Sequence, residues 1–274
     1  RLRCDWSSDV CSSDLANGAD LIIDHADIRR SLLSMKSIIE GERALSFWLA
    51  QQIEVSLHHS DNKIKQEASD LVSLMTPVVK SLFTDMGMEI TSDAMQIFGG
   101  YGYTKDQGIE QLYRDNRITP IYEGTNSVQS IDLVFRKLIN KDGSVIDRYI
   151  KFIEEEIKKN KTETKIKPFA DKLNNYLGIL VNFTNWIKES IKNSKDDASA
   201  ACNDYLKILG LMALAYSWLK VLNVSYKEIN NNKKFFEDKI ETANFFFNRV
   251  LPRIDTHYKS AISGSKYIMD FKFS

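Results

Sequence analysis

Apolar residues recur three or four positions apart through most of the first half of the chain, which is the spacing of one face of an α-helix. The longest such run extends from about residue 63 to residue 100. Pro77 lies inside it and predicts a kink or a break, because proline lacks the backbone N–H that a helix uses. The predicted elements are helices over residues 27–57, 63–100, 110–117 and 128–138, and a loop over residues 118–126.

The second half returns to helical spacing after a polar joint, Asn140-Lys-Asp-Gly143. Neither half shows the alternation of apolar and polar residues that is typical of a half-buried strand. We therefore predict an all-α protein of two helical units in series, over residues 16–140 and 144–274, with no β-sheet of three or more strands. The helices predicted for the second unit cover residues 145–159, 168–190, 198–224 and 235–250.

The first fifteen residues, Arg1 to Leu15, follow no such pattern. They contain neither an initiator Met nor the apolar core of 7–15 residues that a signal peptide requires. The segment resembles translated adapter sequence at the end of a metagenomic read, so we expect it to be non-native and to pack on nothing. On this interpretation the chain begins inside a longer gene.

The charge balance and the cysteines limit the possible partners and the compartment. Lys and Arg together number 37, as do Asp and Glu, so the formal net charge is zero. Wholesale attraction to nucleic acid or to an anionic membrane is therefore not expected. The three cysteines, Cys4, Cys11 and Cys202, are too few and too scattered for a disulfide framework. They are compatible with a reducing compartment, and we predict a cytoplasmic protein.

Two further kinds of site are not predicted. No apolar run reaches the roughly 18 residues that would cross a bilayer, so we expect no membrane span. His58 and His59 lie beside Asp61 but lack a suitably spaced third ligand, so a polar helix end is the better interpretation than a metal site.

Three short segments carry the candidate chemistry: Gln96-Ile-Phe-Gly-Gly-Tyr-Gly-Tyr103, Tyr113-Arg-Asp115 and Ile121-Tyr-Glu-Gly-Thr-Asn126. The glycines of the first segment would let backbone N–H groups approach a phosphate-bearing ligand, or would simply end a helix. In the third segment, Glu123 lies in a loop between apolar helices. If it is partly desolvated, its pKa rises toward neutrality, which suits a general base. The alternative is a surface Glu that pairs with a Lys or an Arg.

Together, in this order and at this spacing, the three segments resemble the signature of the acyl-CoA dehydrogenase family. The resemblance implies a flavin (FAD) enzyme in which Glu123 removes the α-proton of an acyl-CoA thioester, yielding the trans-2-enoyl-CoA. It implies that Tyr122 and Gly124 contact the substrate. The implied cofactor-binding residues are Gln96, Ile97, Phe98, Gly99 and Gly100, which would contact the flavin of a neighbouring subunit, together with Thr125, Asn126, Ser127 and His25.

The sequence departs from the family pattern at three places. Ser127 stands where the family often has Gln, with Gln129 two positions further on, and this puts one flavin hydrogen bond in doubt. Ala26 replaces another common Gln beside His25. The upstream Arg-x-x-Phe-Gly motif is absent, and the adapter-like segment stands in its place, in agreement with a truncated chain.

The second unit resembles the extra helical domain of long bacterial acyl-CoA dehydrogenases, a group that includes the 3-(methylthio)propanoyl-CoA dehydrogenases. This resemblance is carried by Asp204 to Ala215, Lys239 to Phe247 and Arg249 to Pro252. It implies a homo-oligomer that passes its electrons to an electron-transfer flavoprotein. Two alternatives remain open: an acyl-CoA oxidase, which reacts with oxygen instead, and a helical interaction module that has lost the chemistry. We expect this fragment to be inactive by itself.

Overall fold

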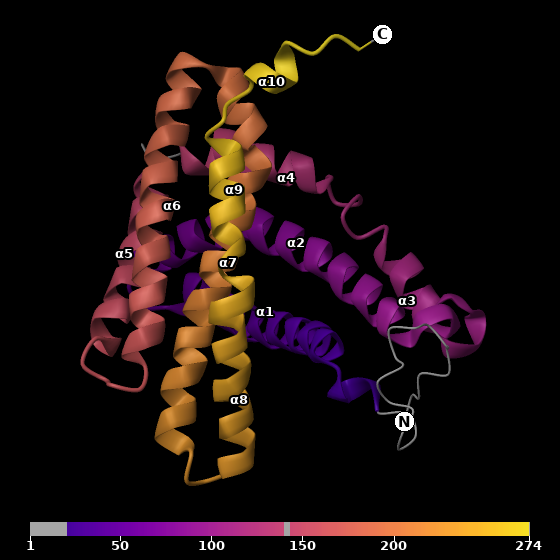
Figure 1. The fold of residues 1–274 in the computed structure, drawn as a ribbon. Coiled ribbons are helices and arrows are strands. Elements are labelled where there is room, and N and C mark those ends of the chain that lie inside the picture. The colour runs from indigo at the N-terminus through magenta and orange to yellow at the C-terminus, as the bar shows by residue number, and fades with distance from the viewer. Residues whose placement is uncertain (1–20, 140–142, 274) are drawn as a thin grey trace.

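The computed structural model describes residues 21–139 and 143–273 (Figure 1). Every regular element in these ranges is helical, which confirms the all-α prediction. The predicted behaviour of Arg1–Leu15 concerns residues outside the described ranges. The elements are α1 (Ala26–His58), α2 (Asn62–Phe98), α3 (Ile109–Asn116), α4 (Asn126–Asp132), α5 (Ser144–Asn160), α6 (Lys167–Asn193), α7 (Lys195–Glu228), α8 (Lys233–Phe245), α9 (Arg253–Ala261) and α10 (Lys266–Met269). Short 3-10 helices cover Ile22–Asp24, Gly99–Tyr103 and Lys105–Gln107, and π-helical turns cover Leu133–Leu138 and Phe246–Val250.

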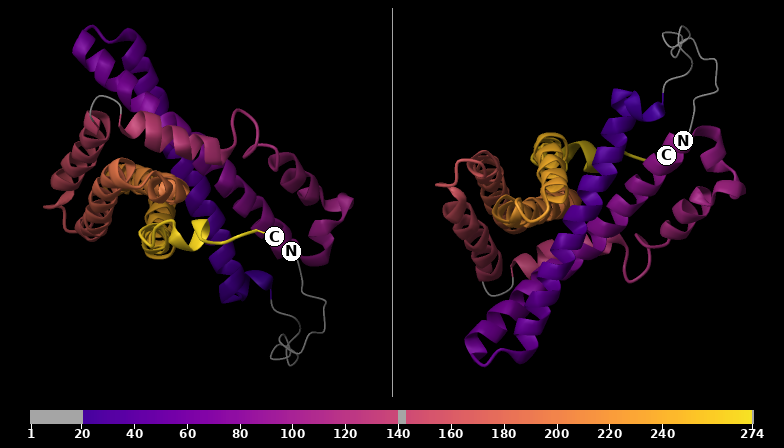
Figure 2. Two further views of the ribbon diagram at one scale, coloured as in Figure 1. Left: turned by 90° about the horizontal axis from the view of Figure 1, so that it is seen from above. Right: turned by 90° about the horizontal axis from the view of Figure 1, so that it is seen from below.

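Helices α1 and α2 form a long antiparallel pair against which α3, α4, α5, α7 and α8 pack, whereas α6 and α9 pack on α7 (Figure 2). The turn between them is fixed by Asp61, whose carboxylate accepts hydrogen bonds from the Lys63 and Ile64 amides at 2.7 and 3.3 Å. This is a helix cap, as expected for a polar helix end. The sequence predicted a kink or a break at Pro77. The break does not occur, because α2 runs through this buried proline without interruption, while the kink stays a prediction. Burial of the surrounding apolar face offsets the one backbone hydrogen bond that proline cannot make.

Helix α7 lies at the centre of the second half and is buried on almost all sides. Its most apolar 18-residue window has a mean hydropathy of 1.4, so by length and composition it would qualify as a membrane span. The expectation that no segment is long and apolar enough to cross a membrane is therefore not met by α7. Within the described fold, 78% of that window is buried against other helices, which is how the core helix of a bundle behaves.

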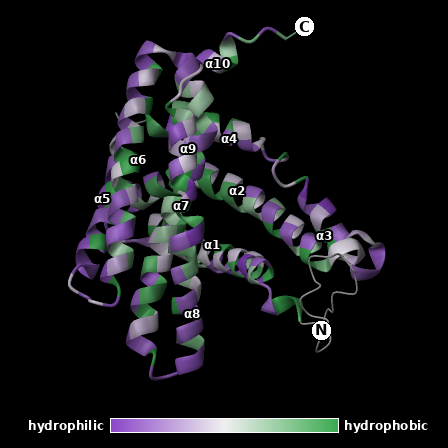
Figure 3. Cartoon of the chain, viewed as in Figure 1, coloured by the Kyte–Doolittle hydropathy of each residue, from purple (hydrophilic) through white to green (hydrophobic). Residues whose placement is uncertain are grey.

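The two predicted units share one continuous hydrophobic core, which extends from Ile38 in α1 to Ala261 in α9. Figure 3 shows apolar positions along the inward faces of the helices and polar positions outward. Trp218 of α7 is 1% exposed, and its indole N–H donates to the Ser37 carbonyl of α1 at 3.1 Å. The rings of Trp48, Phe152 and Tyr216 also meet across the joint, with centroids 5.4–5.9 Å apart. The division of the chain into two units at residues 140–143 stays a prediction, and the two units do not have separate cores.

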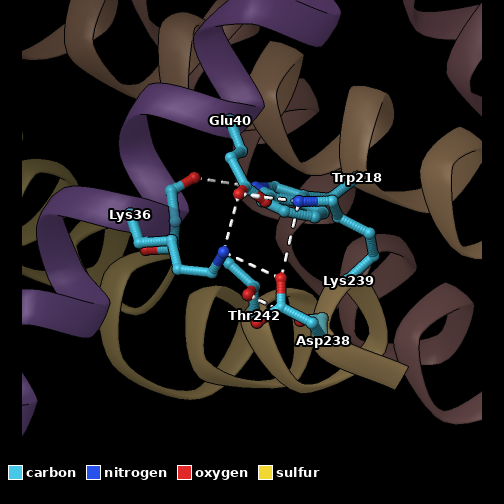
Figure 4. A network of polar contacts seen from close by, with 7 residues as sticks. Lys36, Glu40, Trp218, Asp238, Lys239 and Thr242 are labelled. Atoms are coloured by element: carbon cyan, nitrogen blue, oxygen red, sulfur yellow. Dashed lines mark hydrogen bonds and ion pairs between the residues drawn. The ribbon is translucent and has the colours of Figure 1, made fainter. Parts of the chain in front are cut away.

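A polar network closes the edge of this shared core between α1 and α8 (Figure 4). Lys36 bridges Glu40 and Asp238, each at 2.8 Å, while Lys239 contacts the same two carboxylates at 2.7 and 3.5 Å. Alternating charges of this kind hold two helices in register. The network therefore fixes α8 relative to α1 and covers the Trp218 ring.

Candidate active site

The loop that carries Glu123 is built by short-range hydrogen bonds after α3 ends. The Tyr122 amide donates to the Ile118 carbonyl at 3.1 Å, and the Asn126 amide donates to the Pro120 carbonyl at 3.0 Å. Thr125 then caps α4, since its hydroxyl oxygen accepts a hydrogen bond from the Val128 amide at 3.3 Å. The Thr125 hydroxyl proton remains available for an external acceptor. The predicted loop is confirmed.

Glu123 has a left-handed backbone conformation, with φ = 57°, and Gly124 follows with φ = 79°. Among the described residues, Glu123 is the one non-glycine residue with a positive φ. A side chain with a β-carbon adopts this region at a cost of roughly 1–3 kcal/mol, and such residues cluster at functional sites. The strain is an observation independent of the sequence motif, and it falls on the residue that the motif singles out.

The Glu123 side chain is exposed, as is the Tyr122 side chain at 52%. Partial desolvation, the condition for a general base that the sequence left open, is therefore not met within the described part of this chain. The alternative, a surface Glu that pairs with a Lys or an Arg, is met only in part. Glu123 is exposed and forms no ion pair with a described Lys or Arg, but its charge acts on Lys80. Burial lowers the pKa of the Lys80 ammonium group, while the charges of Asp85 and Glu123 oppose that shift.

Two side chains from different helices hold the carbonyl groups of the strained turn. Gln129 of α4 donates to the Glu123 carbonyl at 2.8 Å, and Lys80 of α2 donates to the Gly124 carbonyl at 2.9 Å. Lys80 was not among the site residues predicted from the sequence. Its position within an apolar helix face gives no sign of a contact made 44 residues away.

The side chain of Asn126, a predicted cofactor contact, is used within the protein. Its amide oxygen accepts from Lys80 at 2.7 Å, and its amide nitrogen donates to Asp85 at 2.7 Å and to Thr84 at 2.9 Å. A contact between Asn126 and the cofactor stays a prediction. It would require an atom of Asn126 other than its side-chain oxygen and nitrogen, which these hydrogen bonds occupy. Ser127 is exposed beside a cavity of about 450 Å³ between α2, α7 and α9, so its hydroxyl remains accessible.

The Gly-rich segment ends α2 as predicted, and its glycines have different structural reasons. Gly99 adopts φ = 60°, which favours glycine. At Gly102, an added β-carbon would lie 2.5 Å from the Met95 carbonyl oxygen and 2.8 Å from the Phe98 β-carbon. Gly100 has neither constraint, because its φ is not positive and nothing lies within 4 Å of the position of a β-carbon. The helix-terminating interpretation therefore explains Gly99 and Gly102 but leaves Gly100 free to contact a ligand.

This difference predicts that alanine destabilises the protein at Gly102 but not at Gly100. Gly102→Ala should lower the free energy of unfolding by about 1–3 kcal/mol, because the methyl group overlaps the backbone of α2. Gly100→Ala should change it by less than about 0.5 kcal/mol, as at other unconstrained surface positions. Urea unfolding of both variants, followed by circular dichroism, measures the contrast. Equal destabilisation by the two substitutions would show that Gly100 also serves the fold.

From the family signature we expect the Gly-rich turn and the Glu123 loop to lie at the same end of the helical bundle, but the structure places them apart. The turn follows the end of α2, whereas Lys80 holds the Glu123 loop beside the middle of that helix (Figure 1). The intervening 19 helical residues correspond to about 28 Å at 1.5 Å per residue. His25, which precedes α1 and is half-buried, belongs to the end with the Gly-rich turn because α1 and α2 are antiparallel.

Two family models match the chain almost throughout. Residues 5–138 match the model "Acyl-CoA dehydrogenase, C-terminal domain", and residues 146–272 match "Acetyl-CoA dehydrogenase C-terminal like". The first match begins within the segment that we expected to be foreign. The chain is 30% identical over 241 residues to the 3-methylmercaptopropionyl-CoA dehydrogenase of Ruegeria pomeroyi, covering 86% of this chain and 40% of that protein. The chain belongs to the acyl-CoA dehydrogenase family.

Solved structures agree on the fold. Caenorhabditis elegans ACDH-11, crystallised in complex with C11-CoA, superposes with a TM-score of 0.70 at 22% identity, over 89% of this chain and 40% of that one. An acyl-CoA dehydrogenase of Bacillus anthracis complexed with FAD gives a TM-score of 0.64 at 15% identity, over 85% and 40% of the two chains. The chain thus spans about two-fifths of the length of the relatives it matches.

Proposed function

We propose that the protein to which this chain belongs is an FAD-dependent acyl-CoA dehydrogenase that converts an acyl-CoA thioester to the trans-2-enoyl-CoA. The observation that carries the proposal is the strained turn at Glu123, held at two carbonyls, in the loop with the family signature. Glu123 would accept the α-proton through its carboxylate. A bound flavin would supply the acceptor for the hydride from the β-carbon.

The exposure of Glu123 fits this role. A base must touch its substrate, so its carboxylate has to face outward from the chain that carries it. Acyl-CoA and cofactor, together with the remaining three-fifths of a full-length protein, would remove water from it.

The residues proposed to hold the flavin are compatible with it. Gly99 and Gly100 leave open space outside the backbone, which permits the close approach of a large ligand. Gln96 is exposed beside them, while Ile97 and Phe98 are half-buried and offer apolar surface. Among the predicted flavin contacts beside the Glu123 loop, the Thr125 hydroxyl proton and the Ser127 hydroxyl are accessible. The Gly-rich turn and the Glu123 loop are about 28 Å apart along α2, which supports the proposal that they contact two different flavins, as in a homo-oligomer.

The substrate is proposed by analogy with a relative. The 3-methylmercaptopropionyl-CoA dehydrogenase makes 3-(methylthio)propanoyl-CoA the first substrate to test. We further propose an electron-transfer flavoprotein as the acceptor and a cytoplasmic location. An oxidase would produce hydrogen peroxide in air, and an inactive module would carry no flavin.

The experiment uses the full-length protein, purified and tested anaerobically with 3-(methylthio)propanoyl-CoA and with straight-chain acyl-CoAs. The expected result is a yellow protein whose flavin absorbance bleaches on addition of one of these thioesters. Peroxide formation in air would instead support the oxidase. A colourless protein that cannot be reconstituted with FAD would contradict the proposal.

A further inference from the structure

We propose that Lys80 is a positioning residue that keeps Glu123 in its strained, outward-facing conformation. Its importance for catalysis rests on the proposed function, but its effect on the loop does not. The proposal is carried by contacts between α2, the Glu123 loop and the start of α4, which are far apart in the sequence.

Lys80 is half-buried, and its ammonium group is held in one place by defined acceptors. One N–H donates to the Gly124 carbonyl at 2.9 Å, and another donates to the Asn126 side-chain oxygen at 2.7 Å. Hydrogen bonds from a charged donor are stronger than neutral ones. Asn126 is itself fixed, because its nitrogen donates to Asp85 at 2.7 Å and to Thr84 at 2.9 Å. Asn126 thus links the Lys80 ammonium group to the Asp85 carboxylate by two hydrogen bonds, and the negative charge of Asp85 stabilises the charged form of Lys80.

The geometry explains how a lysine in α2 can control a side chain that it does not touch. The Gly124 carbonyl is held by Lys80 from one helix, and the Glu123 carbonyl is held by Gln129 from another. These carbonyls belong to the two successive peptide planes that flank the α-carbon of Gly124. The two contacts therefore fix the backbone of Gly124 and one of the two peptide planes that flank the Glu123 α-carbon. On the other side, the Tyr122 amide is held by the Ile118 carbonyl at 3.1 Å, so the turn as a whole favours φ = 57° at Glu123 over the common region of negative φ.

Removal of the ammonium group should release this turn. Lys80→Met keeps the length and the apolar stem of the side chain but has no donor for either oxygen. The loop amides of Tyr122 and Asn126, which now donate to Ile118 and Pro120, would then open more often. Lys80→Arg keeps a charged donor and should recover part of the effect. Lys63→Met is the matched control, because Lys63 is exposed near the start of the same helix and its side chain makes no contact with the loop.

The first test is hydrogen exchange of the 274-residue chain without flavin. The Tyr122 and Asn126 amides should exchange at least about tenfold faster in Lys80→Met than in the wild type, the factor expected for losing about one hydrogen bond. They should exchange at an intermediate rate in Lys80→Arg and at the wild-type rate in Lys63→Met. Equal exchange in Lys80→Met and Lys63→Met would overturn the proposal.

The second test separates positioning from binding in the full-length enzyme. Flavin bleaching at saturating acyl-CoA should slow at least about tenfold in Lys80→Met, because a small displacement of a base has a large effect on rate. The Kd for acyl-CoA should stay within about twofold. Unchanged bleaching would overturn the role of Lys80 in catalysis. If Glu123→Gln also bleaches at the wild-type rate, the proposed function fails, while the exchange result still decides whether Lys80 holds the turn.

Discussion

Replacement of Glu123 by Gln in the full-length protein is expected to slow flavin bleaching by acyl-CoA at least about a hundredfold, the low end for the loss of a general base. Gln keeps the size of the side chain and its capacity for hydrogen bonds, but it has no basic oxygen. The backbone at φ = 57° should persist, because its supports are carbonyl contacts that the substitution leaves in place. Flavin and acyl-CoA should therefore still bind. Stopped-flow absorbance under anaerobic conditions measures the rate.

Two further variants make this result specific. Glu123→Asp should retain part of the activity, because the carboxylate remains but is one methylene group further from the substrate. Glu54→Gln on α1 removes an exposed carboxylate remote from the loop and should leave the rate unchanged. Bleaching at the wild-type rate in Glu123→Gln would show that another group is the base.

Trp218→Ala should destabilise the 274-residue chain by about 3–5 kcal/mol, as expected when a large buried aromatic side chain is removed. Trp218 is 1% exposed, packs between α7 and α1 and donates to the Ser37 carbonyl. Its loss leaves both a cavity and a buried carbonyl without its partner. Because the two predicted units share one core, the variant should still unfold in a single transition, at a lower urea concentration. Circular dichroism and tryptophan fluorescence should report the same midpoint.

Phe47→Ala provides the comparison, since Phe47 belongs to α1 but is 73% exposed. Its removal should change the free energy of unfolding by less than about 0.5 kcal/mol. Two separate transitions in Trp218→Ala, with one half of the helical signal unaffected, would mean that the units fold independently.

Most helices were predictable because they bury one face, which fixes a period of 3.6 residues in the sequence, whereas α7 is buried on almost all sides. α5 was expected over residues 145–159 and covers Ser144–Asn160. Pro77 shows the limit of this reasoning. A single lost hydrogen bond predicts a break, but whether the neighbouring side chains are buried strongly enough to keep the helix continuous depends on tertiary packing. For the same reason, the sequence showed two units but could not show that α7 joins them into one core.

The chemistry of the candidate site was predictable only where it follows the motif. Glu123 and Thr125 could be identified because the family signature is contiguous around them. Lys80 could not, because its contact with Gly124 depends on how α3 and the loop return along α2. The exposure of Glu123 was also hidden, since a sequence does not state what covers a loop.

If Glu123 removes the α-proton of the acyl-CoA, exchange of that proton with solvent depends on its carboxylate. The full-length protein and its Glu123→Gln variant would be incubated with acyl-CoA in D₂O, and deuterium at the α-carbon would be measured by mass spectrometry. The wild type should incorporate deuterium, and the variant should incorporate it at least about a hundredfold more slowly. Equal incorporation by the two proteins would show that Glu123 is not the base.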